Sequence, residues 1–476
     1  MSEKITQQLY EVNNPATGQR LGTIPNMTLQ EVRAVIDRAY ESLNELQSLS
    51  IAKRSSLLKR VSELVKTNQE DLAKTMTSEI GRPITSARGE IMRCGQIFEL
   101  TGSEVKNVFT GRFVPLESYD FPAGNEKRIA IVKREPMGVV GTITPFNFPP
   151  SSFAHKVAPA LAVGNAVVHK PTVLAPFTQM KIAKLIFEAG FPQDSVGVVT
   201  GDSSVIGKEF VENPNIALIS FTGSDTVGLD LASRAILHGK RSIMELGGSD
   251  AQIVLEDADI PKAVGAAALG RFDYAGQFCN STKRLIVRDE VASEFEDALI
   301  QRVKGMRVGD PMVETTSIGP LISKSAVNLM KEFVDDAKSS GGKILFQGEV
   351  PSDTQGYYFP PTIVEMQKQQ KARMAHEEVF GPVFPIIRVK TDMEAISAAN
   401  STEFGLDASV FTKNFARAYS LASKLKVGTV LINDTTRLRW DNLPFGGVKR
   451  SGIGREDVTD TMQEMTESKV IEYNLG

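Results

Sequence analysis

The feature that most constrains the fold is a regular alternation of short apolar runs and helical patterns along residues 137–247. Strand candidates occur at 137–144, 166–170, 196–200 and 217–221. Helical patterns lie between them near 158–162 and over 179–189, and Gly190 follows the second as a stop signal. This alternation predicts a largely parallel, doubly wound α/β sheet.

A second region of the same kind follows over residues 248–447, and a helical region precedes the first at 29–109. In the second region, strands are predicted at 252–255, 284–287 and 428–432, and helices at 291–303 and 326–337. A chain of 476 residues exceeds one compact core, so two domains or more are expected.

Two segments alternate in polarity like strands with one wet face, residues 128–134 and 467–473. They lie far apart in the chain and outside the two α/β regions. We expect them either to pair with each other as an exposed arm or to add to a neighbouring subunit.

Composition describes an ordinary globular protein, with 41% hydrophobic and 23% charged residues. The net charge of −3 gives no reason to expect nucleic acid or an anionic membrane as a partner. The amino terminus is polar, and no apolar run approaches the roughly 18 residues that span a bilayer. Two cysteines cannot build a disulfide framework, so a reducing, cytoplasmic location is expected.

Cys279 lies in a polar loop that carries a glycine, Tyr274-Ala275-Gly276-Gln277-Phe278-Cys279-Asn280. The flanks resemble the start of a helix after a glycine turn, where backbone amides stabilise a thiolate. A nucleophile is therefore favoured over the alternative, a small buried hydrophobe. Cys94 stands in a helical pattern and is interpreted as a packed or half-exposed helix residue.

Two other residues complement a nucleophilic thiol. Glu245 ends an apolar run and precedes Leu246-Gly247-Gly248, where burial would raise its pKa and suit it to activating water. Asn147 follows a buried strand between prolines and offers an amide donor for an oxyanion. The alternatives are a surface carboxylate and a turn asparagine that binds its own backbone.

A phosphate turn is predicted at Gly223-Ser224, where a strand meets a helix, although the spacing to Gly228 departs from the dinucleotide fingerprint. Lys170 is a candidate for contacts with the ribose or phosphate of a cofactor and Glu378 for a ribose, against the alternative of solvated charges. A phosphate cradle, a base and a thiol in this order indicate cofactor-dependent oxidation of an aldehyde. The four histidines His155, His169, His238 and His376 show no metal-site spacing, so no metal is expected.

Taken together, seven motifs resemble the aldehyde dehydrogenase superfamily, in its order and over essentially the whole chain. They are Pro145-Phe146-Asn147-Phe148-Pro149, Lys170-Pro171, Phe221-Thr222-Gly223-Ser224, Glu245-Leu246-Gly247-Gly248, Gly276-Gln277-Phe278-Cys279, Glu377-Glu378-Val379-Phe380-Gly381-Pro382 and Pro444-Phe445-Gly446-Gly447. The resemblance implies an α/β fold with a Rossmann-like cofactor domain (1–117 and 137–247) and an α/β catalytic domain (248–447). It further implies a β-arm (118–136 and 460–476) that joins subunits into a homo-oligomer, a dimer or homotetramer.

The resemblance also implies roles for individual residues. Cys279 attacks the aldehyde, Asn147 and the Cys279 amide hold the oxyanion, and Glu245 activates the water that hydrolyses the thioester. The implied cofactor residues are Thr144, Pro145, Phe146, Lys170, Thr172, Val173, Phe221, Gly223, Ser224, Leu246, Glu378 and Phe380. Members that prefer NAD commonly have a glutamate at the position of Val173. Its absence removes repulsion against a 2′-phosphate, so NADP is predicted as the preferred cofactor, with NAD possible.

The substrate is left open among several aldehydes. His155-Lys156 resembles relatives that act on lactaldehyde, glyceraldehyde 3-phosphate or phosphonoacetaldehyde. Arg93, Arg437 and Arg439 are candidates for an anion site, against the alternative of surface arginines. Phe278 stands where the glyceraldehyde-3-phosphate enzymes usually have an arginine, which weakens the hypothesis that the substrate is phosphorylated. Alternatives are a succinate or other semialdehyde, a CoA-acylating enzyme, a thiol hydrolase and a catalytically silent protein. Glu245 argues against CoA transfer, and the intact residue set argues against a silent protein.

Overall fold

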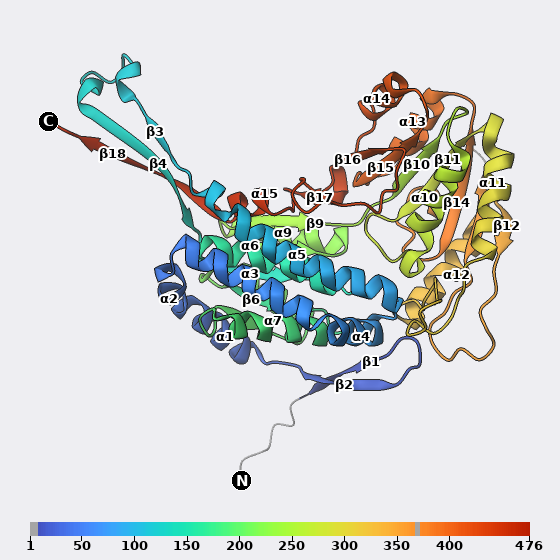
Figure 1. Ribbon diagram of the computed structural model, residues 1–476, viewed down its shortest axis with the longest axis horizontal. Helices are drawn as coiled ribbons and strands as arrows, with labels where there is room; N and C mark the ends of the chain where they lie inside the picture. The colour runs from blue at the N-terminus through green and yellow to red at the C-terminus, as the bar shows by residue number, and fades with distance from the viewer. Residues whose placement is uncertain (1–7, 367–371) are drawn as a thin grey trace, which may run out of the picture.

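The computed structural model describes residues 8–366 and 372–476, so the first seven residues of the predicted cofactor domain lie outside it. The described chain forms two α/β bodies and a β-arm that projects from one of them (Figure 1). The α/β class predicted from the alternating pattern is confirmed.

The first body is built on a six-stranded sheet in the order β17-β9-β8-β5-β6-β7. Its strands are β5 (Val139–Ile143), β6 (Ala166–Lys170), β7 (Val196–Val198), β8 (Ile216–Thr222), β9 (Arg241–Glu245) and β17 (Gly452–Ile453). Five strands run parallel, and β17 pairs antiparallel with β9 at one edge. The chain leaves β7 to return beside β5 as β8, which is the reversal of strand order that creates a ligand crevice in such sheets.

Helices cover this sheet. They are α1 (Leu29–Glu41), α2 (Leu43–Ser48), α3 (Ile51–Thr67), α4 (Gln69–Ile80), α5 (Ile84–Val108), α6 (Pro149–Val163), α7 (Phe177–Ala189), α8 (Ser203–Glu212), α9 (Asp225–Leu237) and α15 (Thr459–Glu464). Gly190 ends α7 in the left-handed conformation, as predicted. Every residue of α6 is buried, because α5 and α7 pack against it.

The second body contains a seven-stranded sheet in the order β12-β13-β14-β11-β10-β15-β16. Its strands are β10 (Asp250–Val254), β11 (Thr282–Arg288), β12 (Lys343–Gln347), β13 (Thr362–Met366), β14 (Val383–Val389), β15 (Asp407–Phe411) and β16 (Thr429–Ile432). Its helices are α10 (Ile260–Phe272), α11 (Asp289–Lys304), α12 (Lys324–Ser339), α13 (Asp392–Asn400) and α14 (Phe415–Ala422). Only the edge strand β12 runs antiparallel to its neighbour in this sheet.

The arm is a three-stranded sheet, β3 (Arg112–Val114), β4 (Arg128–Pro136) and β18 (Thr466–Asn474), with β4 in the middle. β18 pairs antiparallel with β4 along all nine of its residues, so the two alternating segments pair with each other within one chain. A separate hairpin, β1 (Leu9–Asn13) with β2 (Arg20–Pro25), lies near the amino terminus. Short 3₁₀ turns occur at Leu116–Ser118, Asn125–Lys127, Asp273–Gly276, Arg373–Ala375 and Lys449–Ser451.

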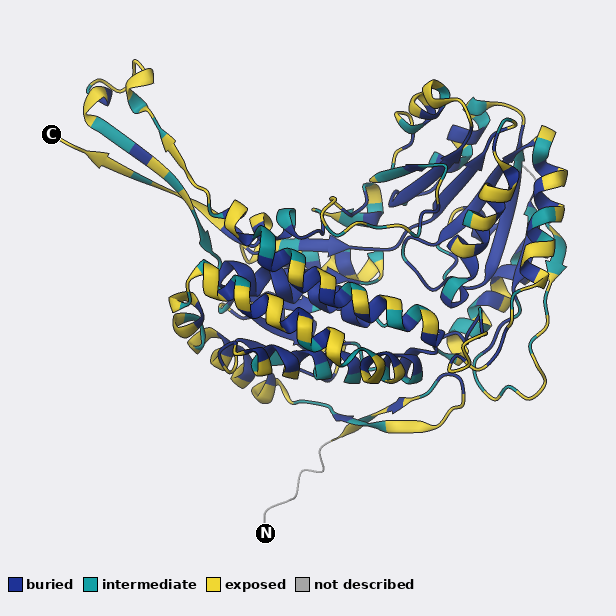
Figure 2. Ribbon diagram, in the orientation of Figure 1, coloured by how far each residue is buried: buried dark blue, intermediate teal, exposed yellow. Residues whose placement is uncertain are grey.

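Each body has its own hydrophobic core, visible as the dark strands and inner helix faces of Figure 2. Tyr274 and Phe278 come from the second body but pack into the core of the first, so the loop between them bridges the two. None of the described helices is both long enough and apolar enough to cross a bilayer.

Candidate active site

Cys279 lies in a turn directly before β11, at the amino-terminal edge of the catalytic sheet. The prediction that it begins a helix is wrong, because Thr282 already belongs to the strand. β11 is buried along its whole length and contains β-branched residues that favour a strand over a helix. The amides of a helix N-terminus are therefore not available to stabilise the thiolate.

The residues before the nucleophile adopt an unusual backbone conformation. Tyr274 and Ala275 have φ of 47° and 52°, in the left-handed region that costs a non-glycine residue about 1–2 kcal/mol. The Tyr274 hydroxyl donates to the Ile80 carbonyl at 2.8 Å, and the Gln277 side chain accepts from the Ile322 amide at 2.9 Å. These buried contacts fix the loop that presents Cys279.

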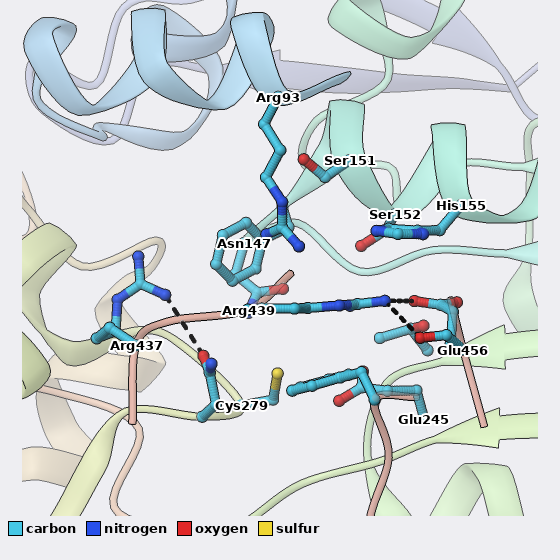
Figure 3. A pocket seen from close by; sticks show the side chains of 14 residues that line it. Arg93, Asn147, Ser151, Ser152, His155, Glu245, Cys279, Arg437, Arg439 and Glu456 are labelled. Carbon is cyan, nitrogen blue, oxygen red and sulfur yellow. Dashed lines mark hydrogen bonds and ion pairs between the residues drawn. The ribbon is translucent and has the colours of Figure 1, made fainter. Parts of the chain in front are cut away.

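Cys279, Glu245 and Asn147 line one pocket of about 420 Å³, a volume that includes the space at its mouth (Figure 3). Glu245 is the last residue of β9 and Asn147 follows β5, so both come from the carboxyl-terminal edge of the first sheet. The other lining residues are Arg93, Phe148, Ser151, Ser152, His155, Thr222, Asn280, Arg437, Arg439, Phe445 and Glu456. The structure thus brings together the three residues predicted to be catalytic.

The thiol of Cys279 and the carboxyl group of Glu245 lie close enough in the pocket for each to influence the pKa of the other. Burial and the nearby Glu456 raise the pKa of Glu245 to about 7. Burial and the charge of Glu245 raise the pKa of Cys279 well above its usual range, while Lys283 opposes that shift. A buried carboxylate half ionised near neutrality can accept the proton of a thiol or of a water molecule.

Two carboxylates that sequence reasoning missed organise the substrate side of the pocket. Asp441 accepts from Arg93 Nη2 at 2.6 Å and contacts His155 Nε2 at 3.0 Å. Glu456 contacts Lys156 Nζ at 2.5 Å and Arg439 Nη2 at 3.3 Å. Burial alone would raise the pKa of both carboxyl groups, but their partners outweigh it. His155 and Arg93 lower the pKa of Asp441 below its usual range. Lys156 and Arg439 lower the pKa of Glu456 to about 2.

A signal for these partners exists in the sequence. Lys156 stands in the stretch Phe153–Val163, which is apolar apart from it and His155, and a buried lysine requires a hydrogen-bonded counter-charge. The sequence does not indicate which acidic residue supplies it, because Glu456 lies 300 residues away in a polar segment that is typical of an exposed loop. Burial and the nearby Arg439 lower the pKa of His155 to about 4, so this imidazole is neutral at physiological pH.

Arg437 is held differently from the other two arginines. Its guanidinium lies 3.5 Å from the centroid of the Phe278 ring and reaches Asp273 at 3.3 Å. Phe278 itself is fully buried and does not line the pocket; its ring supports Arg437 from behind. Within the described residues, Nε of Arg437 and Nε of Arg439 are buried without a hydrogen-bond partner.

A groove of about 1780 Å³, open to solvent, runs along the carboxyl-terminal edge of the first sheet and the start of α9. Eight predicted cofactor residues line it, Thr144, Pro145, Phe146, Lys170, Thr172, Phe221, Gly223 and Ser224. Thr222 lines both this groove and the pocket of Cys279, so the two spaces are neighbours. A Cβ at Gly223 would lie 2.5 Å from the Phe221 ring, so only glycine fits where the backbone turns into α9.

Four predicted cofactor residues do not line the groove. Val173 is half-buried after β6, and Leu246 is buried after β9. Glu378 accepts from the Gly248 amide at 3.0 Å, and the Phe380 ring packs edge-on against Phe146 at 6.0 Å between centroids. Phe146 lines the groove, so Phe380 lies beside it.

The groove residues fit a phosphate-bearing dinucleotide. Lys170 is buried, and the acceptor nearest to its ammonium group is the Pro171 carbonyl at 3.4 Å. Burial lowers the pKa of Lys170 to about 8, and the attraction of Asp202 offsets this only in part. Three cations line the groove, Lys170, Lys208 and Arg234, against one carboxylate, Asp230.

A half-buried thiol beside a buried carboxyl group, at the end of such a groove, defines a class of enzyme that acts through a covalent cysteine adduct beside a nucleotide cofactor. Known proteins identify the family within this class. The Aldehyde dehydrogenase family matches residues 2–471, and the chain belongs to it. It is an NAD(P)-dependent aldehyde oxidoreductase.

Relatives cover the chain almost completely. A lactaldehyde dehydrogenase of Methanocaldococcus jannaschii is 38% identical over 98% of this chain and 98% of its own length. The NADP-dependent succinate-semialdehyde dehydrogenase GabD of Escherichia coli is 36% identical over 97% of this chain and 94% of its own. The structure of the glyceraldehyde-3-phosphate dehydrogenase GapN from M. jannaschii complexed with NADP superimposes with a TM-score of 0.91, at 37% identity, covering 99% of this chain and 100% of that one.

Proposed function

We propose that this protein oxidises a small hydroxylated or anionic aldehyde to its carboxylic acid, with NADP as the preferred cofactor. The observation that carries the proposal is the convergence of Cys279, Glu245 and Asn147 on one pocket beside the groove. Oxidation through a thioester requires a nucleophile, an oxyanion donor and a base for water within reach of one carbonyl carbon.

The reaction begins when Glu245 accepts the Cys279 proton and the thiolate attacks the aldehyde carbon. A carbon–sulfur bond forms, and the Asn147 amide and the Cys279 backbone amide donate to the oxyanion. A dinucleotide in the groove would supply the hydride acceptor, and loss of hydride from the adduct leaves Cys279 as a thioester. Glu245, after releasing the thiol proton to solvent, takes a proton from the water that attacks the thioester, and the carbon–sulfur bond breaks to release the acid and the Cys279 thiolate.

The preference for NADP rests on two features. Val173 stands after Lys170 where a carboxylate would repel a 2′-phosphate, and the groove has two more cations than carboxylates. Two similar proteins point the same way: GabD is named as an NADP-dependent enzyme, and GapN of M. jannaschii was solved in complex with NADP. The test is initial rate against NADP and NAD for the protein and for Val173→Glu. We expect lower kcat/KM with NAD than with NADP, and at least a tenfold shift toward NAD in the variant.

The substrate class follows from the polar groups of the pocket. The buried Nε groups of Arg437 and Arg439 are donors for oxygens of a substrate, and Ser151 Oγ is buried without a partner in the described chain. Lactaldehyde, glyceraldehyde and glyceraldehyde 3-phosphate each carry oxygens next to the aldehyde carbon. Succinate semialdehyde is the second candidate, favoured by the three arginines and by the similarity to GabD.

A substrate panel separates these candidates. Reduced-cofactor absorbance is followed with lactaldehyde, glyceraldehyde, glyceraldehyde 3-phosphate, succinate semialdehyde and an aliphatic aldehyde. A preference for the first three supports the proposal, and a preference for succinate semialdehyde supports the alternative. Equal kcat/KM across the panel, including the aliphatic aldehyde, would mean that the arginines do not select substrate.

We further propose the domain roles given by the motifs: residues 1–117 and 137–247 bind cofactor, 248–447 carry the nucleophile, and 118–136 with 460–476 join subunits. The arm supports this, because Val470 and Tyr473 of β18 are 64% and 51% exposed on a sheet edge that another chain can cover. Val470→Asp should shift the mass measured by light scattering from dimer or tetramer toward monomer. An unchanged mass would place the interface elsewhere.

A cytoplasmic location is proposed because a reducing compartment keeps Cys279 as the free thiol that the chemistry needs. Cell fractionation with antibody detection tests it.

A further inference from the structure

Lys283 is a buried charge for which the proposed mechanism has no role. It is the second residue of β11, four positions after Cys279, and its side chain is fully buried. Its ammonium group donates to the Phe278 carbonyl at 2.8 Å and to the Cys279 carbonyl, and it lies 3.1 Å from Glu378 Oε1. Both carbonyls belong to the turn that presents the thiol.

Glu378 continues this contact toward the base. Its Oε1 also accepts from the Gly248 amide at 3.0 Å, in the loop that follows Glu245. A Cβ at Gly247 would lie 2.3 Å from Glu378 Oε2, so glycine is required there for the carboxylate to approach. Lys283 and Glu378 therefore tie the turn of the nucleophile to the loop of the base through a continuous chain of polar contacts.

The charges around the thiol give Lys283 a second effect. Glu245 from β9 and Glu378 from the loop before β14 both disfavour ionisation of Cys279, in addition to burial, and Lys283 favours it. Behind Lys283 lie the buried carboxyls of Asp250 and Asp407, whose pKa burial raises and Lys283 lowers.

A buried ammonium group is costly to desolvate, so packing alone does not explain this residue. A methionine or leucine would fill the same volume without the penalty. What the charge adds is the set of directed contacts to the two carbonyls and an attraction for a negative sulfur.

We propose that Lys283 is a positioning residue, which holds the Cys279 turn in place and whose charge favours the thiolate form of Cys279. The proposal rests on Cys279 as the nucleophile, but not on the identity of the aldehyde or the cofactor. It assigns to a side chain the stabilisation that a helix N-terminus would otherwise supply.

The test measures thiolate reactivity without substrate or cofactor. Iodoacetamide alkylates a thiolate with loss of iodide, so its rate against pH reports the ionisation of Cys279, and peptide mass spectrometry locates the adduct. In Lys283→Met the rate profile should move to higher pH by about one unit or more, which slows alkylation near pH 7.5 about tenfold. Cys94 is fully buried in α5, so its alkylation reports unfolding in the same sample.

Lys240→Met is the matched control. Lys240 is also a buried lysine that donates to two backbone carbonyls, those of Phe210 and Asn213, but it lies in the cofactor body. Its replacement should lower the melting temperature and leave the Cys279 profile unchanged. If Lys240→Met moves the profile as far as Lys283→Met does, the effect is one of general stability and the proposal is wrong.

Glu378→Gln keeps the proposal testable if Lys283→Met does not fold. This variant removes one carboxylate and leaves Lys283 in place, so Cys279 should be alkylated faster at pH 7.5. A slower or unchanged rate would overturn the proposal. Because no aldehyde is used, an inactive substrate panel would contradict the proposed function without affecting this result.

Discussion

The substrate pocket and the cofactor groove meet at Thr222 but differ in how their buried cations are paired with carboxylates. In the pocket, arginines and lysine are paired with protein carboxylates: Arg93 with Asp441, and Lys156 and Arg439 with Glu456. In the groove, Arg234 pairs with Asp230 at 3.1 Å and Lys208 with Glu212 at 3.8 Å, whereas Lys170 has no carboxylate within ion-pair distance in the described chain. The pocket thus brings its own counter-ions and offers a fixed arrangement, whereas Lys170 in the groove is left for a negatively charged ligand to pair with.

Two buried lysines show the contrast most directly. Lys156 has Glu456 at 2.5 Å, and its ion pair is complete within the protein. Lys170 has a weak contact to a carbonyl at 3.4 Å, and burial lowers its pKa to about 8. A paired charge supports structure, and an underpaired one marks a place where a ligand binds.

The largest expected effect removes the pocket's chemistry and leaves the groove intact. Cys279→Ala should lower kcat by at least about 10³-fold, since no other group in the pocket can form the thioester. The affinity for NADPH, measured by fluorescence, should stay within about threefold of wild type. Cys94→Ala is the control and should keep most of the activity. Residual activity above about 1% in Cys279→Ala would contradict the assignment of the nucleophile.

The next effect concerns the base. Glu245→Gln should lower kcat by about 10²–10⁴-fold, the usual contribution of a general base. The pKa of Glu245 is raised to about 7, and the base acts when ionised, so wild-type kcat/KM should rise with pH through about 7 and then level off. The variant should lose this rise, as measured in initial-rate profiles from pH 5.5 to 9. A rise that persists in Glu245→Gln would assign it to another group.

A pair of lysine variants tests the comparison itself. Lys170→Met should raise the KM for NADP about 10- to 100-fold, because a charged hydrogen bond is worth about 1.5–3 kcal/mol, while thermal stability changes little. Lys156→Met should lower thermal stability and change the KM for NADP little, because breaking a buried ion pair costs about 3–5 kcal/mol and leaves the Glu456 charge unpaired. Calorimetry and cofactor titration on both variants measure this. If both variants change the KM for NADP and the thermal stability to the same extent, the distinction between a structural and a ligand-binding lysine is wrong.

Sequence patterns were sufficient for parts of the molecule where local periodicity and tertiary structure agree. The strands near residues 139–143 and 166–170, and the pairing of the two alternating segments in the arm, are of this kind. The three residues expected to act together do meet in one pocket, because Glu245 ends a buried strand, Asn147 follows one and Cys279 directly precedes one.

Long-range contacts account for what the sequence missed. Cys279 looked like the start of a helix because Gly276 and polar residues surround it, yet Thr282 pairs with Asp250 in the parallel sheet and extends the strand up to the turn. The roles of Asp441 and Glu456 depend on partners hundreds of residues away, which no local pattern contains. Acidic residues in polar loops look the same whether they face water or a buried arginine.

The smallest expected effect comes from a substitution that leaves a pocket cation, Arg93, without a paired carboxylate, as Lys170 is in the groove. Asp441→Asn removes the carboxylate that pairs with Arg93 and keeps an acceptor for it and for His155. The unpaired guanidinium should then attract an anionic substrate, by about 1 kcal/mol at pocket distances with partial screening. The ratio of kcat/KM for succinate semialdehyde to that for lactaldehyde should rise about fivefold.

Arg93→Met provides the opposite change, because it leaves Asp441 without its cation, and the same ratio should fall. Both ratios are measured at constant NADP and at two salt concentrations, and the Asp441→Asn gain should shrink at high salt, since screening weakens it. If the ratio is insensitive to both substitutions, the pair serves to hold α5 against the loop after β16 and does not select substrate. If the ratio responds to both substitutions as expected, the Asp441 carboxylate, and not the arginines alone, sets the preference for hydroxylated over charged aldehydes.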